Sequence, residues 1–209
     1  MPLVHSETIG EHCTLLLWKL TETEDVLRKS LGSTFNSDEL GLISHPQKRR
    51  EWLASRMLVK TLVEQFGIDY MGLHKDEHGK AYLVNNSSHI SITHTFEFVA
   101  VAINPVSSVG IDMEKEDEKL RRTSRKYLSP SEYAHAADEI SPLCMYWCAK
   151  EALYKMYGRK KVSFRESIFI QPFTGKHPQL KGILTDELTI IKSDIHLRWF
   201  DGHCLAIAL

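Results

Sequence analysis

The stretch YWCAKEALYK at Tyr146–Lys155 decides how the rest of this sequence is interpreted. It contains neither glycine nor proline, it consists largely of good helix formers, and Ser141-Pro142 just before it is a helix start signal. Trp147, Glu151 and Lys155 are spaced four residues apart, so they lie along one face of the predicted helix. Taken alone, this stripe is most simply interpreted as an exposed Glu–Lys pair beside a core tryptophan.

A second stretch, VGIDME at Val109–Glu114, changes that interpretation. We expect a strand there, and Asp112 and Glu114 would then point to the same face of a sheet because side chains alternate along a strand. Two carboxylates from a strand and Glu151 from the helix would form the oxygen-rich ligand set that Mg²⁺ prefers. The sequence therefore predicts a magnesium site at Asp112, Glu114 and Glu151.

Composition limits the class of protein. The chain has 209 residues, of which 43% are hydrophobic and 25% charged, as in an ordinary soluble globular protein. The net charge of −1 argues against nucleic-acid or membrane binding through bulk charge, so an anion site must be a local cluster. The four cysteines form no C-x-x-C pair, and we expect buried free thiols in a reducing compartment. Without a secretory signal or a membrane-length apolar run, the expected location is the cytoplasm.

Local patterns predict an alternation of strands and helices. Helices are expected at residues 22–31, 47–66 and 146–155, with shorter pieces after residue 37 and between a capping signal at 129–132 and residue 137. Strands are expected at residues 13–17, 80–84, 89–93, 98–103, 109–114, 167–170, 188–191, 195–200 and 204–209. The charge run at 115–119 is expected to be a solvated loop or a helix start.

The two halves of the sequence resemble each other, which indicates an internal duplication. Three echoes occur in the same order: Ser37-Asp38-Glu39 with Ser131-Glu132, the spacing of Trp52, Arg56 and Lys60 with that of Trp147, Glu151 and Lys155, and the run at 98–103 with that at 204–209. We therefore predict an α+β fold of two similar units, residues 1–104 and 105–209. Each would have an antiparallel-rich sheet packed on a long helix, and the active site would lie in the cleft between them.

The first half offers candidates for an anion site. The first half of the helix predicted over residues 47–66 contains Lys48, Arg49, Arg50 and Arg56. They are either a solvated basic face or a phosphate clamp, because guanidinium groups bind phosphate through two hydrogen bonds. Gly79-Lys80 is either a plain β-turn or a place where backbone approaches a flat ring, with Lys80 near phosphate.

The sequence lacks the motifs that mark several other enzyme classes. His94 follows a predicted strand, and a single histidine is more often structural than catalytic. The sequence has no zinc-ligand spacing, no G-x-x-x-x-G-K-[ST] phosphate loop and no G-x-S-x-G nucleophile motif. Zinc enzymes, P-loop kinases and α/β-hydrolases are therefore disfavoured.

Together, these motifs resemble those of a known family. Gly110–Glu114 followed by Trp147–Lys155 closely resembles the paired signature of the 4′-phosphopantetheinyl transferases, G-[VI]-D-x-E and then W-x-x-K-E-x-x-x-K. Gly79-Lys80, Ser91–His94 and the basic helix with Arg56 resemble three earlier motifs of that family. The length and the duplication resemble its surfactin-synthetase-activating type, which implies a monomer with two similar halves.

This resemblance implies a reaction. The family moves the 4′-phosphopantetheine group of coenzyme A to a serine of an apo acyl or peptidyl carrier protein, giving holo carrier protein and adenosine 3′,5′-bisphosphate. The resemblance places Mg²⁺ at Asp112, Glu114 and Glu151. It makes Glu151 the candidate base, acting directly or through a water on the metal. Lys155, and less strongly Lys150, would stabilise charge on the phosphoryl and leaving groups.

The same resemblance names the residues that would bind coenzyme A. They are Lys48, Arg49, Arg56, Gly79, Lys80, Thr93 and His94. Two positions depart from the family pattern, since Ala81 stands where proline is frequent and Thr93 where serine is usual. Two alternatives remain: another Mg²⁺-dependent phosphotransferase or a nuclease, and a non-enzymatic scaffold that binds an acidic partner through Lys48–Arg50.

Overall fold

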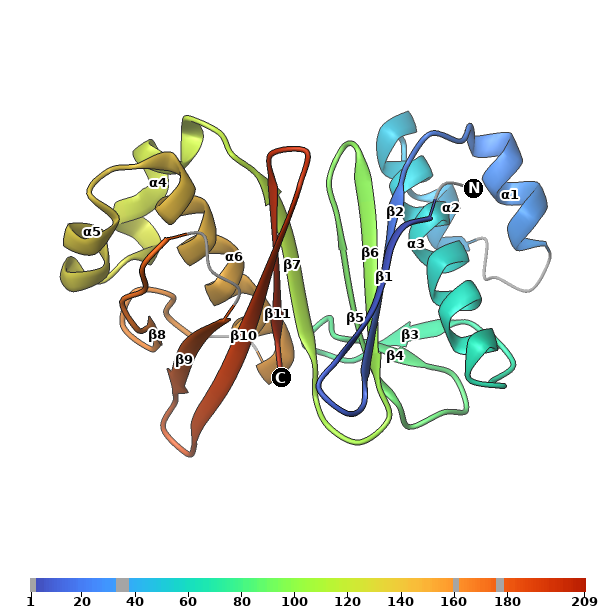
Figure 1. Cartoon of the computed structure of the whole chain (residues 1–209). Coiled ribbons are helices and arrows are strands. Elements are labelled where there is room, and N and C mark those ends of the chain that lie inside the picture. The colour runs from blue at the N-terminus through green and yellow to red at the C-terminus, as the bar shows by residue number, and fades with distance from the viewer. Residues whose placement is uncertain (1–2, 33–37, 160–161, 176–178) are drawn as a thin grey trace. The chain divides into compact units, whose positions relative to one another are not determined.

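The chain forms two compact units, each built on one antiparallel sheet. The structure is a computed structural model that describes residues 3–32, 38–159, 162–175 and 179–209. Unit 1 comprises Met1–Ser108 and unit 2 comprises Val109–Leu209. Helices pack on the sheet of each unit (Figure 1).

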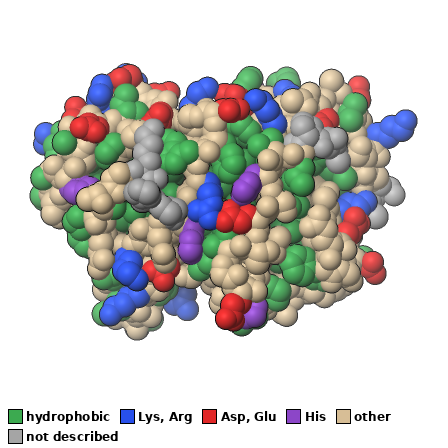
Figure 2. All heavy atoms as spheres, in the orientation of Figure 1, with side chains coloured by type: hydrophobic (Ala, Val, Ile, Leu, Met, Phe, Trp, Pro, Cys, Tyr) green, Lys and Arg blue, Asp and Glu red, His purple; other side chains and the backbone are tan. Residues whose placement is uncertain are grey.

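Each unit exposes charged side chains of both signs. On the face shown in Figure 2, lysine and arginine side chains lie among aspartate and glutamate side chains, in keeping with a net charge of −1. Among the described residues, no helix combines the length and the apolar composition needed to cross a membrane.

Unit 1 contains a six-stranded sheet in the order β1-β2-β6-β5-β4-β3. Its strands are β1 (Leu3–Ile9), β2 (Cys13–Lys19), β3 (Leu73–Lys75), β4 (Ala81–Leu83), β5 (His89–His94) and β6 (Phe98–Asn104), and its helices are α1 (Glu24–Leu31), α2 (Asp38–Gly41) and α3 (Pro46–Gln65). All seven residues of β6 are buried, as expected for a continuous apolar run.

Helix α3 is the long helix of unit 1. Pro46 occupies its first turn, where a missing N–H is tolerated, and Gly67 follows its C-terminal end with a positive φ of 69°. Leu53, Leu58 and Leu62 are buried along one side of α3 and belong to the same apolar cluster as the inner residues of β2 and β6. This periodicity makes α3 the cover of the sheet.

Unit 2 contains a five-stranded sheet in the order β7-β11-β10-β9-β8. Its strands are β7 (Gly110–Lys115), β8 (Ile168–Ile170), β9 (Gln179–Thr185), β10 (Ile190–Phe200) and β11 (His203–Ala208), and its helices are α4 (Lys119–Tyr127), α5 (Pro130–Ala136) and α6 (Ile140–Tyr157). Helix α6 is buried on most sides and forms the centre of this unit's apolar cluster.

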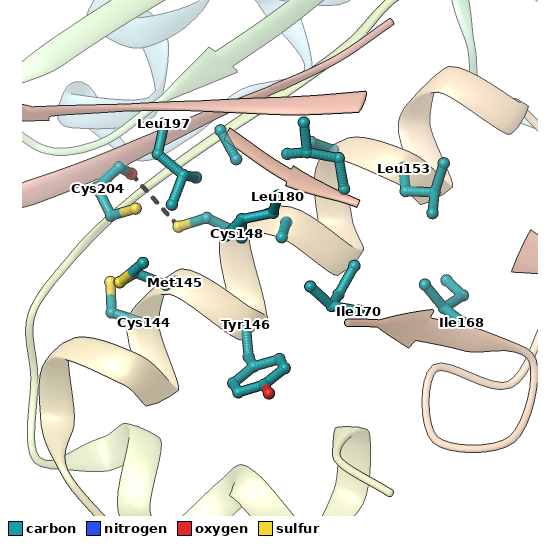
Figure 3. Packing of buried hydrophobic residues seen from close by; sticks show 14 of the residues in the cluster. Cys144, Met145, Tyr146, Cys148, Leu153, Ile168, Ile170, Leu180, Leu197 and Cys204 are labelled. Atoms are coloured by element: carbon teal, nitrogen blue, oxygen red, sulfur yellow. Dashed lines mark hydrogen bonds between the residues drawn. The ribbon is translucent and has the colours of Figure 1, made fainter. Parts of the chain in front are cut away.

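The core of unit 2 is rich in sulfur (Figure 3). Cys144 and Cys148 project from α6 toward Cys204 on β11, and the Cys148 Sγ donates to the Cys204 carbonyl oxygen at 3.3 Å. All four cysteines of the chain are free and buried, which confirms the prediction of buried free thiols. They act as small apolar side chains in the packing.

The predicted duplication is visible in the order of elements. The series β2-α1-α2-α3-β3-β4-β5-β6 in unit 1 recurs as β7-α4-α5-α6-β8-β9-β10-β11 in unit 2. The strand orders also correspond, because β2-β6-β5-β4-β3 matches β7-β11-β10-β9-β8, with β1 as an addition in unit 1. The α+β prediction of two similar halves is confirmed. Ser37, which took part in one of the three sequence echoes, lies outside the described residues.

Several elements differ from the sequence predictions. Strands β1, β3 and β9 were not predicted, and for helix α4 only a possible start in the run 115–119 was expected. The two strands expected at 188–191 and 195–200 are one continuous strand, β10, which begins at Ile190. In β9 the buried positions are Leu180, Gly182 and Leu184, so glycine interrupts the apolar alternation that marks a strand. In α4 the buried residues Leu120, Ser124 and Tyr127 have helical spacing, but charged residues surround them.

Helix α6 touches strand β7 at backbone distance. A Cβ added to Gly110 would meet the Ala152 carbonyl oxygen and the Met156 amide nitrogen, and would lie 2.9 Å from the Met156 Cα. These are backbone atoms of a helix and cannot rotate away as a side chain can. Only glycine at position 110 allows α6 to pack this closely, and this contact brings the carboxylates of β7 beside α6.

Gly110→Ala should therefore strongly destabilise unit 2. We expect a loss of about 3 kcal/mol or more in the free energy of unfolding, at the upper end of overpacking costs because the obstructing atoms are backbone. The measurement is urea unfolding followed by circular dichroism. Gly41→Ala is the control, since a Cβ there meets nothing within 4 Å. A Gly110→Ala protein as stable as the control would show that α6 does not pack at this distance.

Candidate functional site

Three carboxylates come together where β7 faces α6. Asp112 and Glu114 are on one face of β7, and Glu151 is on the side of α6 that also carries Trp147 and Lys155. Asp112 is buried, whereas Glu114 and Glu151 are half-buried. We call Asp112, Glu114 and Glu151 the carboxylate trio.

Two lysines neutralise part of this negative charge. The Lys155 Nζ lies 2.8 Å from the Asp112 Oδ1, and the Lys119 Nζ lies 3.4 Å from the Glu114 Oε2. Lys155 is one helical turn beyond Glu151, so α6 contributes both a carboxylate and an ammonium group to the same place. The resulting site combines acidic oxygens with the positive charge of an ammonium group.

Crowding of the carboxylates perturbs their protonation. Burial raises the pKa of the Glu151 carboxyl to about 7, and the charges of Asp112 and Glu114 add to this rise while Lys155 opposes it. Burial also raises the pKa of Glu114, again with a contribution from Asp112, whereas Lys119 and a hydrogen bond from Trp147 lower it. A site that disfavours its own negative charge favours a cation.

The donor chemistry of the carboxylate trio fits a hard divalent cation such as Mg²⁺. The ammonium group of Lys155 already supplies a positive charge next to Asp112, as a bound cation would. Across the ranges that the structure describes, no three histidine, cysteine, aspartate or glutamate side chains are arranged as a ready metal-ligand group. The magnesium site at these residues therefore stays a prediction.

Lys150 is in a different environment from its neighbour Glu151. Its side chain is fully buried, and its Nζ donates to the Glu132 carboxylate and to three backbone carbonyl oxygens. An ammonium group has three donors, so these acceptors use all of them. This contradicts the expected role of Lys150 in stabilising charge on a substrate, because no donor remains for a phosphate oxygen.

In unit 1, two predicted coenzyme A residues meet at one buried carboxylate. The Lys48 Nζ lies 2.7 Å from the Glu51 Oε2, and the His94 Nδ1 lies 3.2 Å from the same oxygen. The Glu51 side chain is only 4% exposed, whereas those of Lys48 and His94 are 59% and 39% exposed. Glu51 thus holds a lysine from α3 and a histidine from the end of β5 together at the surface.

The two predicted arginines are engaged with other groups. Arg49 forms two hydrogen bonds with Glu24, at 2.8 and 2.7 Å, and donates to the carbonyls of Leu40 and Ile43. Arg56 pairs with Glu39 at 2.9 Å, and its guanidinium stacks on the Trp52 ring. Both tie α3 to the segments before it. A role of either arginine at a phosphate stays a prediction.

The remaining predicted residues lie in one turn and one strand of unit 1. Gly79 has a positive φ of 88° in the turn before β4, where the amides of His78 and Lys80 donate to the Asp76 carboxylate. The Lys80 Nζ reaches Ser108 at 3.2 Å. Thr93 is buried in β5, one residue before His94.

Unit 2 also matches a known protein family. Residues 108–208, which cover almost all of unit 2, match the model of the 4′-phosphopantetheinyl transferase superfamily. Unit 2 is therefore similar to this superfamily along nearly its whole length. The matched range includes the whole carboxylate trio, Lys155 and Lys150.

Two curated proteins that are similar to this chain carry the name of the same activity. A protein of Haemophilus influenzae named "Putative 4′-phosphopantetheinyl transferase" is 29% identical over 132 residues, which cover 56% of this chain and 55% of that protein. A "4′-phosphopantetheinyl transferase" of Bacillus subtilis is 25% identical over 124 residues, covering 55% of each chain. The chain thus spans little more than half the length of these relatives.

Four residues that shape these sites were not predicted from the sequence. They are Glu51, Gly110, Lys119 and Glu132. In the sequence, Glu132 is recognisable only as part of a capping signal, and Gly110 only as part of a motif. Glu51 lies three residues after Lys48, a spacing that places the two on neighbouring positions of a helix and could have revealed the pair. Lys119 reaches Glu114 because the chain turns back after β7, and no sequence pattern indicates that turn.

The raised pKa of Glu151 predicts a pH-dependent stability in metal-free protein. The folded pKa is about 7, above the ordinary value of 4.5, so between these pH values the unfolded state releases its proton first and stability falls as pH rises. Glu151→Gln cannot ionise. Its stability relative to the unaltered protein should therefore increase by about 1–3 kcal/mol between about pH 5 and pH 8.

Urea unfolding in the presence of EDTA measures this difference. Glu166→Gln, at an exposed position of the same unit, controls for loss of one negative charge. A constant stability difference between Glu151→Gln and the unaltered protein across this pH range would contradict the crowding of the carboxylate trio.

Proposed function

We propose that this protein transfers the 4′-phosphopantetheine group from coenzyme A to a serine of an apo carrier protein in a Mg²⁺-dependent reaction. The observation that carries the proposal is the carboxylate trio beside Lys155, in the unit that matches the superfamily. A reaction at a diphosphate needs positive charge against its oxygens and a base for the attacking hydroxyl. The site contains groups suited to both tasks.

The attacking group in this proposal is the serine hydroxyl of the carrier. Its oxygen forms a bond to the phosphorus that bears the pantetheine arm, and the bond from that phosphorus to the bridging oxygen breaks. The electron pair leaves with adenosine 3′,5′-bisphosphate. Glu151 takes the serine proton, either directly or through a water molecule.

Positive charge at the diphosphate comes from two sources in this proposal. Mg²⁺ held by the carboxylate trio would neutralise diphosphate oxygens. Lys155, now 2.8 Å from Asp112, is placed to donate to an oxygen of the transferring phosphoryl group or of the leaving group. Lys150 has no part in this charge stabilisation, because its donors are engaged in the core.

Coenzyme A also carries a 3′-phosphate, and we assign it to Lys48 and His94. The two are held together by Glu51 and remain exposed, as a surface anion site requires. Arg49 and Arg56 are more engaged within the protein, so we place them in a supporting role. Gly79 and Lys80 are assigned to the adenine and its neighbouring phosphate.

The direct test combines the protein with coenzyme A, Mg²⁺ and a panel of apo carrier proteins from fatty-acid, polyketide and nonribosomal-peptide systems. Intact mass spectrometry should show a carrier gaining one phosphopantetheine group only when all components are present. Coenzyme A consumption without carrier modification would instead indicate another phosphotransferase. No reaction with any carrier and no binding of coenzyme A would favour the scaffold alternative.

Asp112→Asn should remove most of this activity. The change keeps the size of the side chain but removes ligand charge, so turnover should fall by at least about 100-fold, more than is usual for loss of an outer-shell partner. Asp194→Asn is a matched control, because Asp194 pairs with Lys181 at 2.9 Å in an exposed part of the same unit. Retained turnover in Asp112→Asn at saturating Mg²⁺ would show that the metal site is misassigned.

Lys48→Met should weaken the use of coenzyme A by roughly ten- to a hundredfold in kcat/KM, as expected for one charge-assisted hydrogen bond of about 1.5–3 kcal/mol. With dephospho-coenzyme A, which lacks the 3′-phosphate, the same substitution should cost little more. Lys29→Met, at an exposed position of α1, is the control for loss of a surface lysine. Equal losses with both donors would mean that Lys48 does not contact the 3′-phosphate, and His94→Gln tests the second residue in the same way.

A further inference from the structure

A fully buried ion pair lies one residue away from the proposed base. The Lys150 Nζ is 2.7 Å from the Glu132 Oε2, and the two side chains are 0% and 1% exposed. Burying both charges carries a desolvation cost that an apolar pair of the same size would avoid. The pair is therefore a poor choice for stability alone, and its hydrogen bonds indicate what else it does.

Lys150 joins α6 to three other segments through backbone carbonyls. Its Nζ donates to the carbonyl oxygen of Tyr127 at 2.8 Å, of Phe164 at 2.8 Å and of Ile168 at 2.6 Å. These belong to the end of α4, to the segment after α6 and to the start of β8. One ammonium group thus attaches α6 to elements on the side away from β7.

Glu132, the other member of the ion pair, makes further hydrogen bonds. Its Oε2 also accepts from the Ser129 amide at 2.8 Å, as part of the capping box that starts α5, and its Oε1 accepts from the Ile170 amide at 2.8 Å. Ile168 and Ile170 of β8 lie next to α6 in the core, as Figure 3 shows. The pair therefore locks α4, α5, α6 and β8 together through directional bonds, whereas apolar contacts alone would permit sliding.

The opposite side of α6 is held against β7 at Gly110, as the close backbone contact there shows. Glu151 follows Lys150 directly in the helix, so any rotation or translation of α6 moves both. We infer that Glu132 and Lys150 are positioning residues, which set the location of the Glu151 carboxylate relative to Asp112 and Glu114. This inference rests on the proposed function for its meaning in catalysis, but its structural content can be tested without it.

Catalysis requires accurate placement of the Glu151 carboxylate, which explains why a rigid support for α6 is useful. Functional groups must be held within about 0.5 Å of their productive positions. A misplacement of about 1 Å can cost roughly 100-fold in rate. Loss of groups that orient metal ligands typically costs 10- to 100-fold in metal affinity or activity.

The first part of the test is structural and uses metal-free protein. Crystal structures of the unaltered protein, Lys150→Met and Glu132→Gln give the separations of the Glu151 carboxylate from Asp112 and Glu114. Leu180→Ala removes a buried side chain of the same apolar cluster and leaves the ion pair in place, so it controls for general destabilisation. Lys181→Met controls for loss of a lysine from an exposed ion pair.

We expect Glu151 to move by about 1 Å or more in Lys150→Met and Glu132→Gln, and by less than about 0.5 Å in both controls. If Lys150→Met does not fold, the milder Glu132→Gln decides. The inference is overturned if Glu151 stays within about 0.5 Å in the variants of the pair, or if Leu180→Ala displaces it equally.

The second part measures the consequence for the site. Titration with Mn²⁺, followed by electron paramagnetic resonance, should show affinity reduced about tenfold or more in the variants of the pair and little changed in the controls. In the transfer assay, kcat should fall while KM for coenzyme A changes by less than about twofold, because the pair does not contact that substrate. A loss shared equally by Leu180→Ala would reduce the pair to a purely structural role.

The two proposals fail in different ways. If the unaltered protein neither binds Mn²⁺ nor modifies a carrier, the proposed function fails. The positioning inference is then still decided by the displacement of Glu151 in the metal-free structures.

Discussion

The contact between α6 and β7 at Gly110 is the constraint on which the rest of unit 2 depends. A strand and a helix usually keep their backbones apart by the width of side chains, but here a missing Cβ lets them meet. This approach brings Asp112 within 2.8 Å of Lys155 and places Glu151 beside both strand carboxylates. Without it, the acidic residues of the two elements would be separated by a layer of packing.

Bringing these carboxylates together has an electrostatic cost that other parts of the unit offset. The pKa of Glu151 rises to about 7 and that of Glu114 also rises, so negative charge is disfavoured in the folded state. Lys155 and Lys119 compensate part of this charge from α6 and from the start of α4. Because negative charge remains in excess at the carboxylate trio, an additional positive charge would be stabilised there. This is the physical basis of the proposed cation site.

Each unit also contains a buried glutamate that binds a lysine, but the lysine is exposed in unit 1 and buried in unit 2. In unit 1, Glu51 holds Lys48 and His94 at the surface, where they can meet an anion. In unit 2, Glu132 holds Lys150 inside the core, where it ties four elements together. The difference follows from the position of the lysine. Lys48 stands in the exposed first turns of α3, whereas Lys150 lies on the buried side of α6.

The sequence by itself determined the α+β class, the duplication and the two elements that carry the carboxylate trio, because apolar periodicity and residue spacing are local properties. It did not determine that Lys150 is a core residue, although Lys150 and Glu151 are neighbours in the same motif. The two side chains differ in environment because adjacent residues of a helix point in different directions. Only the packing of α4, α5 and β8 decides which of these directions is buried. The pairings of Glu51 with His94 and of Gly110 with Met156 join residues distant in sequence. Such contacts depend on how strands and helices pack in three dimensions, and no local pattern records them.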